Sequence, residues 1–187
     1  MRIAAIVLAL TLTGCATAPA QRAHVYSSDL GGLVYRGADQ VIDTASPQLS
    51  RAKPVIVATA VNVDDLDDSS TFGRLASQLV SSRLSQRGYM VRDVTYTGAL
   101  TITPETGEMV LSREAHKLAA EADAQAVVAG AYAVGGEKIY LNIRLLGAVD
   151  GRVLSATDLV IPLDANTHRM VLTGRKSDPD RRLRASR

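Results

Sequence analysis

The sequence predicts an α/β (α+β) sandwich: a mixed sheet of about four to five strands, about three helices packed on it, and an antiparallel meander at its C-terminal end. Helical and extended patterns alternate through the first half of the chain. The second half holds three extended segments separated by turn dipeptides. Hydrophobic residues make up 47% of the 187 residues, which is enough for one core. We therefore expect one folded domain over residues 29–163.

The first fourteen residues have the order of an export signal. Arg2 provides a positive start, an apolar run of signal-peptide length spans 3–11, and Leu-Thr-Gly-Cys follows at 12–15. The run is too short for a membrane-spanning helix, which needs about 20 residues. Residues 1–14 are therefore predicted to be a signal peptide.

The segment 12–15 resembles the lipobox of bacterial lipoproteins. The resemblance implies cleavage before Cys15 and covalent attachment of a diacylglycerol and an N-acyl lipid there. Acyl chains contribute about 0.8 kcal/mol per buried methylene, so two or three chains anchor a protein permanently. Ala16 stands where an aspartate would, by the known sorting rules, retain the protein at the inner membrane. We expect an outer-membrane, periplasm-facing anchor; a signal that merely contains a cysteine is the alternative.

The lipidated segment 15–28 has the composition of a flexible tether. Apolar residues then recur at helical spacing from Asp29, which is placed to cap a helix, to Ala45. Pro54 opens a β-branched run over 55–63, whose continuous apolarity predicts a central strand covered on both faces.

An acidic segment, 64–70, leads into a second helix predicted over 72–87. Gly88 is placed to end this helix, and the alternation over 89–94 predicts a strand with one covered face. A linking stretch through Gly98 and Pro104 follows.

Ser112 is placed to cap a third helix over 113–124, and strand character resumes at 126–132. Turn dipeptides at 135–136 and 150–151 separate the three C-terminal strands. From about Asp164 the hydrophobic pattern fades, and we expect a basic disordered tail over 164–187. Its basic residues are Arg169, Arg175, Lys176, Arg181, Arg182, Arg184 and Arg187.

Several segments, taken together and in this order, resemble the FlgO family of outer-membrane proteins. They are V-D-D-L at 63–66, F-G-R-L at 72–75 with Q-L at 78–79, R-G-Y at 87–89, G-E at 107–108 before L-S-R at 111–113, G-A-Y at 130–132, I-Y-L-N-I-R-L at 139–145 and G-R-V at 151–153. The resemblance covers roughly residues 31–163. It implies association with the flagellum at the outer membrane, around the ring through which the rod passes, and a role in full motility or flagellar stability.

A wider resemblance connects the chain to small envelope domains in CsgG, in the N-terminal part of TolB and in lipoproteins that activate peptidoglycan synthases. Such domains bind other proteins. They imply an alternative function, in which the protein regulates cell-wall synthesis or forms part of a secretion or assembly complex. Assembly into a homo-oligomer is also expected, because related domains assemble around pores. A small-ligand binder is disfavoured by the shortage of aromatic and polar site residues.

Composition and motifs argue against enzymes and nucleic-acid binders. The 21 basic and 19 acidic residues leave a formal charge of only +2, so no strong field favours nucleic acid. The single cysteine forms neither an internal disulfide nor a zinc-ligand pair. Neither a G-x-S-x-G elbow nor a phosphate loop is present, and His24, His116 and His168 lack metal-ligand spacing. We expect no catalysis and neither a metal nor a cofactor besides the lipid at Cys15.

The acidic segment and two arginines are the candidate contact residues for a partner. Asp64, Asp65, Asp67 and Asp68 lack the spaced ligands of an EF-hand, so a loop that precedes a helix is favoured over a Ca²⁺ site. Arg74 and Arg113 stand at predicted helix starts, where they could pair with these aspartates or with a partner; a structural role is favoured. The basic tail could contact anionic lipopolysaccharide or peptidoglycan, and a solvated tail is the equal alternative.

Overall fold

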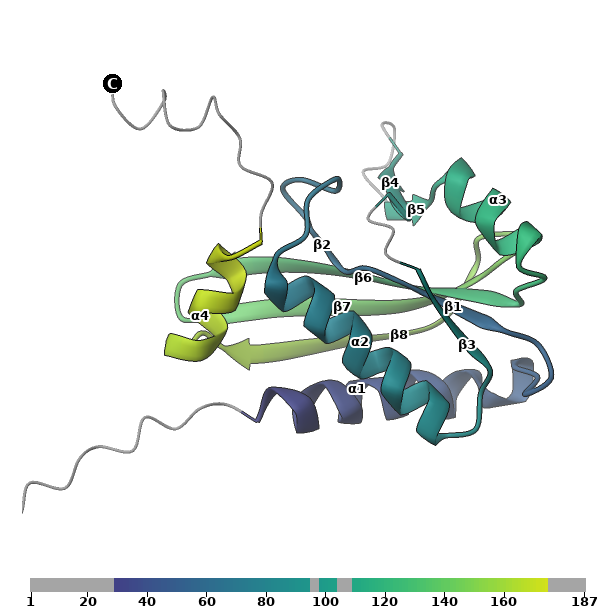
Figure 1. Cartoon of the computed structure of the whole chain (residues 1–187), viewed down its shortest axis with the longest axis horizontal. Helices are drawn as coiled ribbons and strands as arrows, with labels where there is room; N and C mark the ends of the chain where they lie inside the picture. The colour runs from purple at the N-terminus through teal and green to yellow at the C-terminus, as the bar shows by residue number, and fades with distance from the viewer. Residues whose placement is uncertain (1–28, 95–97, 104–108, 175–187) are drawn as a thin grey trace, which may run out of the picture.

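Parallel strands form one half of the main sheet and an antiparallel meander forms the other (Figure 1). The computed structural model describes residues 29–94, 98–103 and 109–174. Within these residues the main sheet has six strands, in the order β3-β1-β6-β7-β8 with β2 also paired to β6, and β4 and β5 form a separate sheet of two strands. The elements are α1 (Leu30–Ala45), the 3-10 turn η1 (Ser46–Gln48), β1 (Val55–Ala58), β2 (Val61–Asn62), α2 (Thr71–Gln86), β3 (Val91–Val94), β4 (Leu100–Ile102), β5 (Met109–Leu111), α3 (Arg113–Glu121), β6 (Ala126–Gly135), β7 (Lys138–Gly147), β8 (Val153–Pro162) and α4 (Ala165–Leu172).

The predicted first helix and central strand are confirmed, with one interruption. The side chain of Asp29 caps α1 by accepting a hydrogen bond from the backbone N–H of Gly32. All four residues of β1 are buried, because β3 and β6 flank the strand and both faces are covered. The expected strand over 55–63 breaks after Ala58 and resumes as β2, which pairs with β6 further along.

Helix α2 and strand β3 follow the predicted order. Ser70 caps α2, and Gly88 ends the helix region with φ +81°, a conformation that glycine adopts without strain. The stretch through Gly98 and Pro104 was predicted as a linker, and it instead contributes β4, which pairs with β5. These strands have three residues each, too short for a periodic pattern to mark them.

The meander is confirmed along its whole length. Strand β6 pairs with β7 from Ala126 to Gly135, and β7 pairs with β8. Gly136 and Gly151 sit in the two connecting turns with φ of +53° and +66°.

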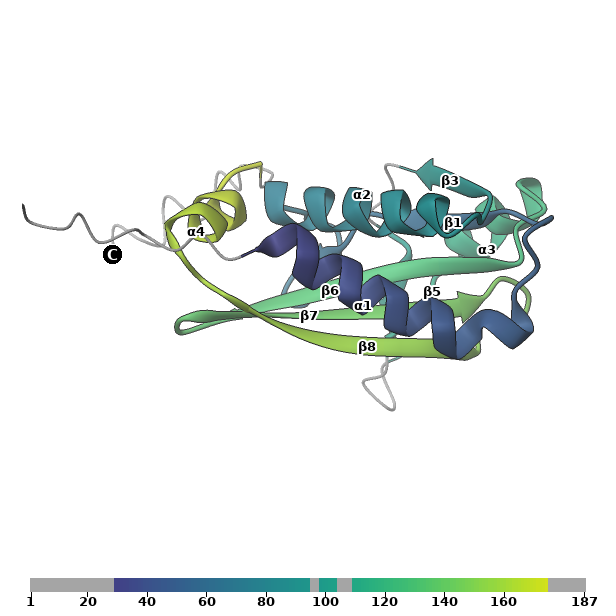
Figure 2. The ribbon, with the colours of Figure 1, turned by 90° about the horizontal axis from the view of Figure 1, so that it is seen from below.

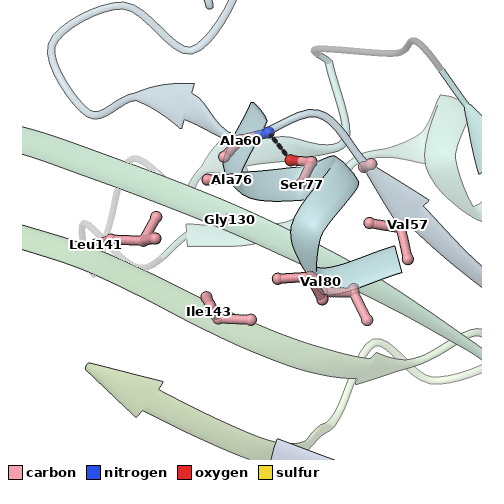
Figure 3. A pocket seen from close by; sticks show the side chains of 10 residues that line it. Val57, Ala60, Ala76, Ser77, Val80, Gly130, Leu141 and Ile143 are labelled. Atoms are coloured by element: carbon pink, nitrogen blue, oxygen red, sulfur yellow. Dashed lines mark hydrogen bonds between the residues drawn. The ribbon is translucent and has the colours of Figure 1, made fainter. Parts of the chain in front are cut away.

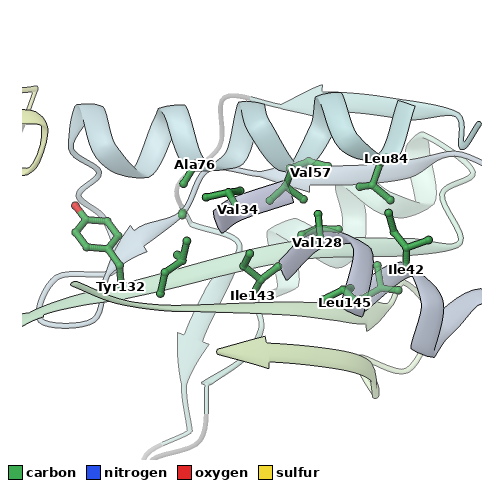
Figure 4. Close-up of a cluster of buried hydrophobic side chains, with 14 of the residues drawn as sticks. Val34, Ile42, Val57, Ala76, Leu84, Val128, Tyr132, Ile143 and Leu145 are labelled. Atoms are coloured by element: carbon green, nitrogen blue, oxygen red, sulfur yellow. The ribbon is translucent and has the colours of Figure 1, made fainter. Parts of the chain in front are cut away.

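Two cores lie on opposite faces of the main sheet. The larger one lies between the sheet and helices α1 and α2 and includes Val34, Val57, Leu84, Val128 and Ile143 (Figure 4). The smaller one lies under α3 and the β4–β5 pair, with Ala115, Ala119 and Leu111 packed on the opposite face of β1 and β6. Figure 2 shows α1 lying across the meander strands.

The expectation of a disordered tail from Asp164 is wrong for the residues up to Leu172. They form α4, with Asp164 as its N-cap, and this helix packs beside α2. Only Thr167 and Val171 of α4 are buried, so its hydrophobic stripe is too small to stand out in sequence. The remaining tail, 175–187, lies outside the described residues.

Ion pairs connect α1 to α2 across their exposed sides. Both oxygens of the Asp39 carboxylate accept hydrogen bonds from Arg83, at 2.9 and 2.7 Å, and Arg87 donates to Asp39 and to Asp43. The hydrogen bond from Arg83 is the main reason why the pKa of Asp39 lies below its ordinary value. The pairs should therefore stabilise the contact between the helices while Asp39 is ionised.

Replacing Asp39 with asparagine is expected to lower the melting temperature at pH 7 by several degrees. Because folding lowers the pKa of Asp39, its contribution is present above the unfolded pKa of about 3.9 and is lost as the pH falls through the folded pKa. Thermal unfolding of both proteins from pH 7 to pH 2 should show the difference shrinking on acidification. Asp43→Asn is the control, since the Asp43 side chain is 63% exposed and pairs with Arg87 but not with Arg83. An equal effect of the two substitutions on the melting temperature would contradict the role assigned to Asp39.

Candidate functional site: the carboxyl edge of the parallel strands

The carboxyl ends of parallel strands are where open α/β sheets usually bind ligands. Here β1 is central between β3 and β6, so this rule indicates the crevice between β1 and β6. A small pocket lies there, lined mainly by apolar side chains (Figure 3). Ala60 contributes to this lining, and its backbone N–H donates to Ser77 Oγ at 2.7 Å.

Backbone and small residues fill this crevice at its mouth. Strand β2 continues from β1 and pairs with β6 there. A Cβ at Gly130 would lie 2.8 Å from the Cβ of Ala60, and a Cβ at Gly73 would lie 2.3 Å from the carbonyl oxygen of Ala60. These approaches bring α2 and β6 into close contact with Ala60. The crevice is a packing joint between α2 and the sheet.

Tyr132 connects this joint to the start of α2. Its hydroxyl accepts a hydrogen bond from Ser70 N–H at 3.1 Å and donates to Ser70 Oγ at 2.7 Å. Its ring meets Phe72 edge to face, with centroids 5.2 Å apart. Because Ser70 is the N-cap, the buried tyrosine fixes where α2 begins.

A Tyr132→Phe protein is expected to lose about 1–3 kcal/mol of folding free energy, because a buried N–H and a buried hydroxyl each lose a partner. Urea unfolding of the purified chain measures this loss. Tyr140→Phe is the matched control, since the Tyr140 side chain is 51% exposed and no change is expected. Equal stability of the Tyr132→Phe protein and the wild type would contradict a stabilising role for the Tyr132 hydroxyl.

The acidic segment forms the loop between β2 and α2. Asp64 and Asp65 are exposed, while Asp68 is buried. The Asp65 carboxylate accepts from the backbone N–H of Asp67 at 3.2 Å, so part of this charge supports the turn. Among the described residues, no three His, Cys, Asp or Glu side chains gather closely enough to hold a metal ion. The helix cap itself is Ser70 and not an aspartate.

Arg74 holds the end of α4 against the start of α2. Its guanidinium donates to the carbonyl oxygens of Ser69 and Gly174 and to Thr71 Oγ1, at 3.0–3.3 Å. The backbone N–H of Thr71 also donates to the carbonyl oxygen of Thr173 at 2.9 Å. The structural role favoured for Arg74 is thus supported by its contacts.

Arg113 belongs to a different part of the molecule. It is the exposed first residue of α3, which covers the face of the sheet opposite α2. Neither Arg74 nor Arg113 forms a salt bridge with Asp64 or Asp65 within the described residues. Within the described residues, salt bridges therefore do not join the four candidate contact residues to one another.

A polar cleft beside this joint was not predicted from the sequence. It lies at the carboxyl ends of β1 and β3, is open to solvent and is bordered by α2. It is lined by Val57, Thr59, Arg74, Ser77, Gln78, Asp93 and Val94. Arg74 is the one predicted candidate that it contains. Asp93 and Gln78 line the same cleft because β3 pairs in parallel with β1 beside α2, a non-local arrangement that no local motif marks.

Cys15 and the segment that follows it lie outside the described residues. In the part of the chain that the structure does describe, none of the helices has the length and apolarity needed to cross a bilayer.

Comparison with known proteins identifies the family of this chain. The model of the FlgO protein family matches residues 35–166. Among solved structures, the C-terminal domain of LpoB from Salmonella enterica is 14% identical, with a TM-score of 0.52 over 72% of this chain and 98% of that one. The PelC dodecamer from Paraburkholderia phytofirmans is 18% identical, with a TM-score of 0.41 over 61% of this chain and 74% of that one. A search of curated proteins gives no match.

The likeness to the LpoB domain concerns the fold alone at this level of identity. The family match is stronger, because it spans most of the chain and includes every strand of the main sheet. The order of motifs noted in the sequence agrees with it. The chain belongs to the FlgO protein family.

Proposed function

We propose that this protein is an outer-membrane lipoprotein, anchored through lipid on Cys15, whose FlgO domain binds other envelope proteins at the outer ring of the flagellum and supports motility. The observation that carries the proposal is the family match over residues 35–166. The lipobox-like segment at 12–15 supports the anchor.

The contacts around the carboxyl edge support binding rather than catalysis. The crevice used by many α/β enzymes is closed here by Ala60, Gly73 and Gly130. The side chain of Ser70 caps α2, and that of Arg74 holds the contact between α2 and the end of α4. We therefore propose that the protein acts through contacts with partners and uses neither a metal nor a cofactor.

In-cell crosslinking tests this function. The chain is expressed at its natural level, crosslinked in intact cells and purified from outer membranes, and its partners are identified by mass spectrometry. We expect proteins of the flagellar outer ring, together with weaker swimming in soft agar when the gene is deleted. Crosslinks to cell-wall synthases or to a secretion complex, with normal swimming, would instead establish the alternative function. Crosslinks to neither group would contradict both.

A further inference from the structure

The last strand of the meander leaves one long edge of the main sheet open. β8 spans Val153–Pro162 and, among the described residues, pairs only with β7. At the opposite edge β3 has four residues. In an antiparallel strand about half of the backbone N–H and C=O groups point away from the existing neighbour. β8 therefore presents a row of donors and acceptors that suits another extended backbone.

This edge has few of the features that usually block strand addition. The register shift in the β7–β8 pair is confined to Leu145 and Leu146, and Pro162 stands at the far end. Between them, residues 155–161 contain neither proline nor lysine, which are common edge blockers. Their side chains are held in place: Thr157 Oγ1 donates to Gln40 Oε1 of α1 at 2.6 Å, and Asp158 accepts from Asn142 of β7 at 2.7 Å. The edge is ordered before any partner arrives.

We infer that the β8 edge binds an extended segment of a partner protein as an added strand of the main sheet. This inference rests on the proposed protein-binding function and assigns the binding to the β8 edge. Main-chain hydrogen bonds would provide most of the attraction, and the neighbouring side chains would provide selectivity.

The position of α1 selects this kind of partner over a second copy of the chain. α1 lies directly over β8, since a Cβ at Gly37 would be 2.8 Å from Leu159 and Gln40 bonds Thr157. Two copies joined antiparallel at this edge would place their β8 strands about 4.8 Å apart, with both α1 helices on the same face of the joined sheet. Packed helices need about 8–10 Å between their axes, so the two α1 helices would collide. A lone strand without a covering helix avoids this clash.

The exposed face of the meander indicates the chemistry of the added segment. Next to the edge, Val160 and its cross-strand neighbour Tyr140 are each 51% exposed, and Asp158 is exposed one pair further along. An apolar side chain beside Val160 and a basic or hydroxyl side chain beside Asp158 would fit this row. The partner segment is thus extended, free of proline and of alternating character.

Hydrogen exchange with a defined peptide tests the edge. The probe is a ten-residue peptide of alternating valine and threonine with a lysine at each end, added to the full mature lipoprotein in detergent micelles. Its control carries N-methyl groups on four consecutive central residues, which blocks both of its edges. We expect exchange of the outward amides of 155–161 to slow by about tenfold or more with the first peptide only. The amides of β7 and β3 should not change.

Several outcomes would overturn the inference. Equal protection by both peptides, no protection, or protection confined to β3 would exclude backbone pairing at β8. Protection that is present without peptide and is lost when residues 16–28 are deleted would assign the edge to the chain itself. Protection that grows with protein concentration would assign it to a second copy.

Crosslinking in cells separates this inference from the proposed function. A photoreactive residue is placed at Val160 on the β8 edge, at Asp65 in the β2–α2 loop or at Arg92 on the β3 edge, all at exposed positions. Capture of flagellar ring proteins from Val160 supports both proposals. Capture of the same proteins from Asp65 or Arg92 alone would keep the function and refute the β8 edge.

Discussion

A Cys15→Ser protein is expected to lose its membrane attachment. The thiol of Cys15 is the group that would accept the diacylglycerol, and a serine hydroxyl does not replace it in that reaction. Without two or three acyl chains, each worth about 0.8 kcal/mol per buried methylene, the membrane-bound fraction should fall by about tenfold or more. Metabolic labelling with palmitate, followed by fractionation, measures both the lipid and the location.

Ala16→Asp is the matched control for this change, because it alters the neighbouring residue and leaves the thiol in place. This protein should keep its palmitate label and move to the inner membrane, because an aspartate after the lipidated cysteine is the retention signal of the known sorting rules. A wild-type protein that takes up no palmitate, or a Cys15→Ser protein that stays in the membrane, would show that Cys15 is not the anchor.

Replacing Gly73 with alanine is expected to be the most damaging change of a single atom in the folded domain. The new Cβ would lie 2.3 Å from the carbonyl oxygen of Ala60, 2.6 Å from Ser69 Oγ and 3.0 Å from Tyr132. Since the first of these is backbone, α2 must move away from β2 to make room. We expect a loss of about 3 kcal/mol or more, which corresponds to a fall of about 10 °C in the melting temperature.

Gly31→Ala is the control, because it makes the same change in the first turn of α1. There the nearest atom to the new Cβ is Asp29 Oδ1, at 3.9 Å. Alanine favours helices over glycine by about 0.5–1 kcal/mol, so this protein should be as stable as the wild type or slightly more so. Calorimetry of both variants compares them, and similar melting temperatures would mean that the contact of Gly73 with Ala60 is not a tight joint.

Much of the fold could be predicted because its signals are local. Asp29, Ser112 and Gly88 mark helix ends through their own backbone or side-chain bonding, and the structure confirms all three. The turns at Gly136 and Gly151 are likewise set by residues within the turns. When the role of a residue depends on its near neighbours in sequence, that role can be predicted without a structure.

The missing elements depend on contacts between distant residues. α4 is held by Thr173 and Gly174 against Thr71 and Arg74, about a hundred positions earlier in the chain. The polar cleft could not be predicted either, because its lining combines Asp93 of β3 with residues of α2 and β1, which precede it in the chain. Arg74 donates to two carbonyl oxygens and to Thr71 Oγ1, partners that no sequence pattern displays.

If the protein is anchored through Cys15 as proposed, the placement of α1 has a mechanical consequence. α1 runs antiparallel to β8, since Gly37 meets Leu159 and Gln40 meets Thr157 (Figure 1). A pull that enters at Leu30 and is resisted by a strand added to β8 would load this contact in shear along its whole length. Shear requires many side-chain contacts to slip together, whereas peeling breaks them one at a time. The force would also bypass β1 and β3, which lie on the far side of β6 from β8, so that half of the sheet would carry little of the load.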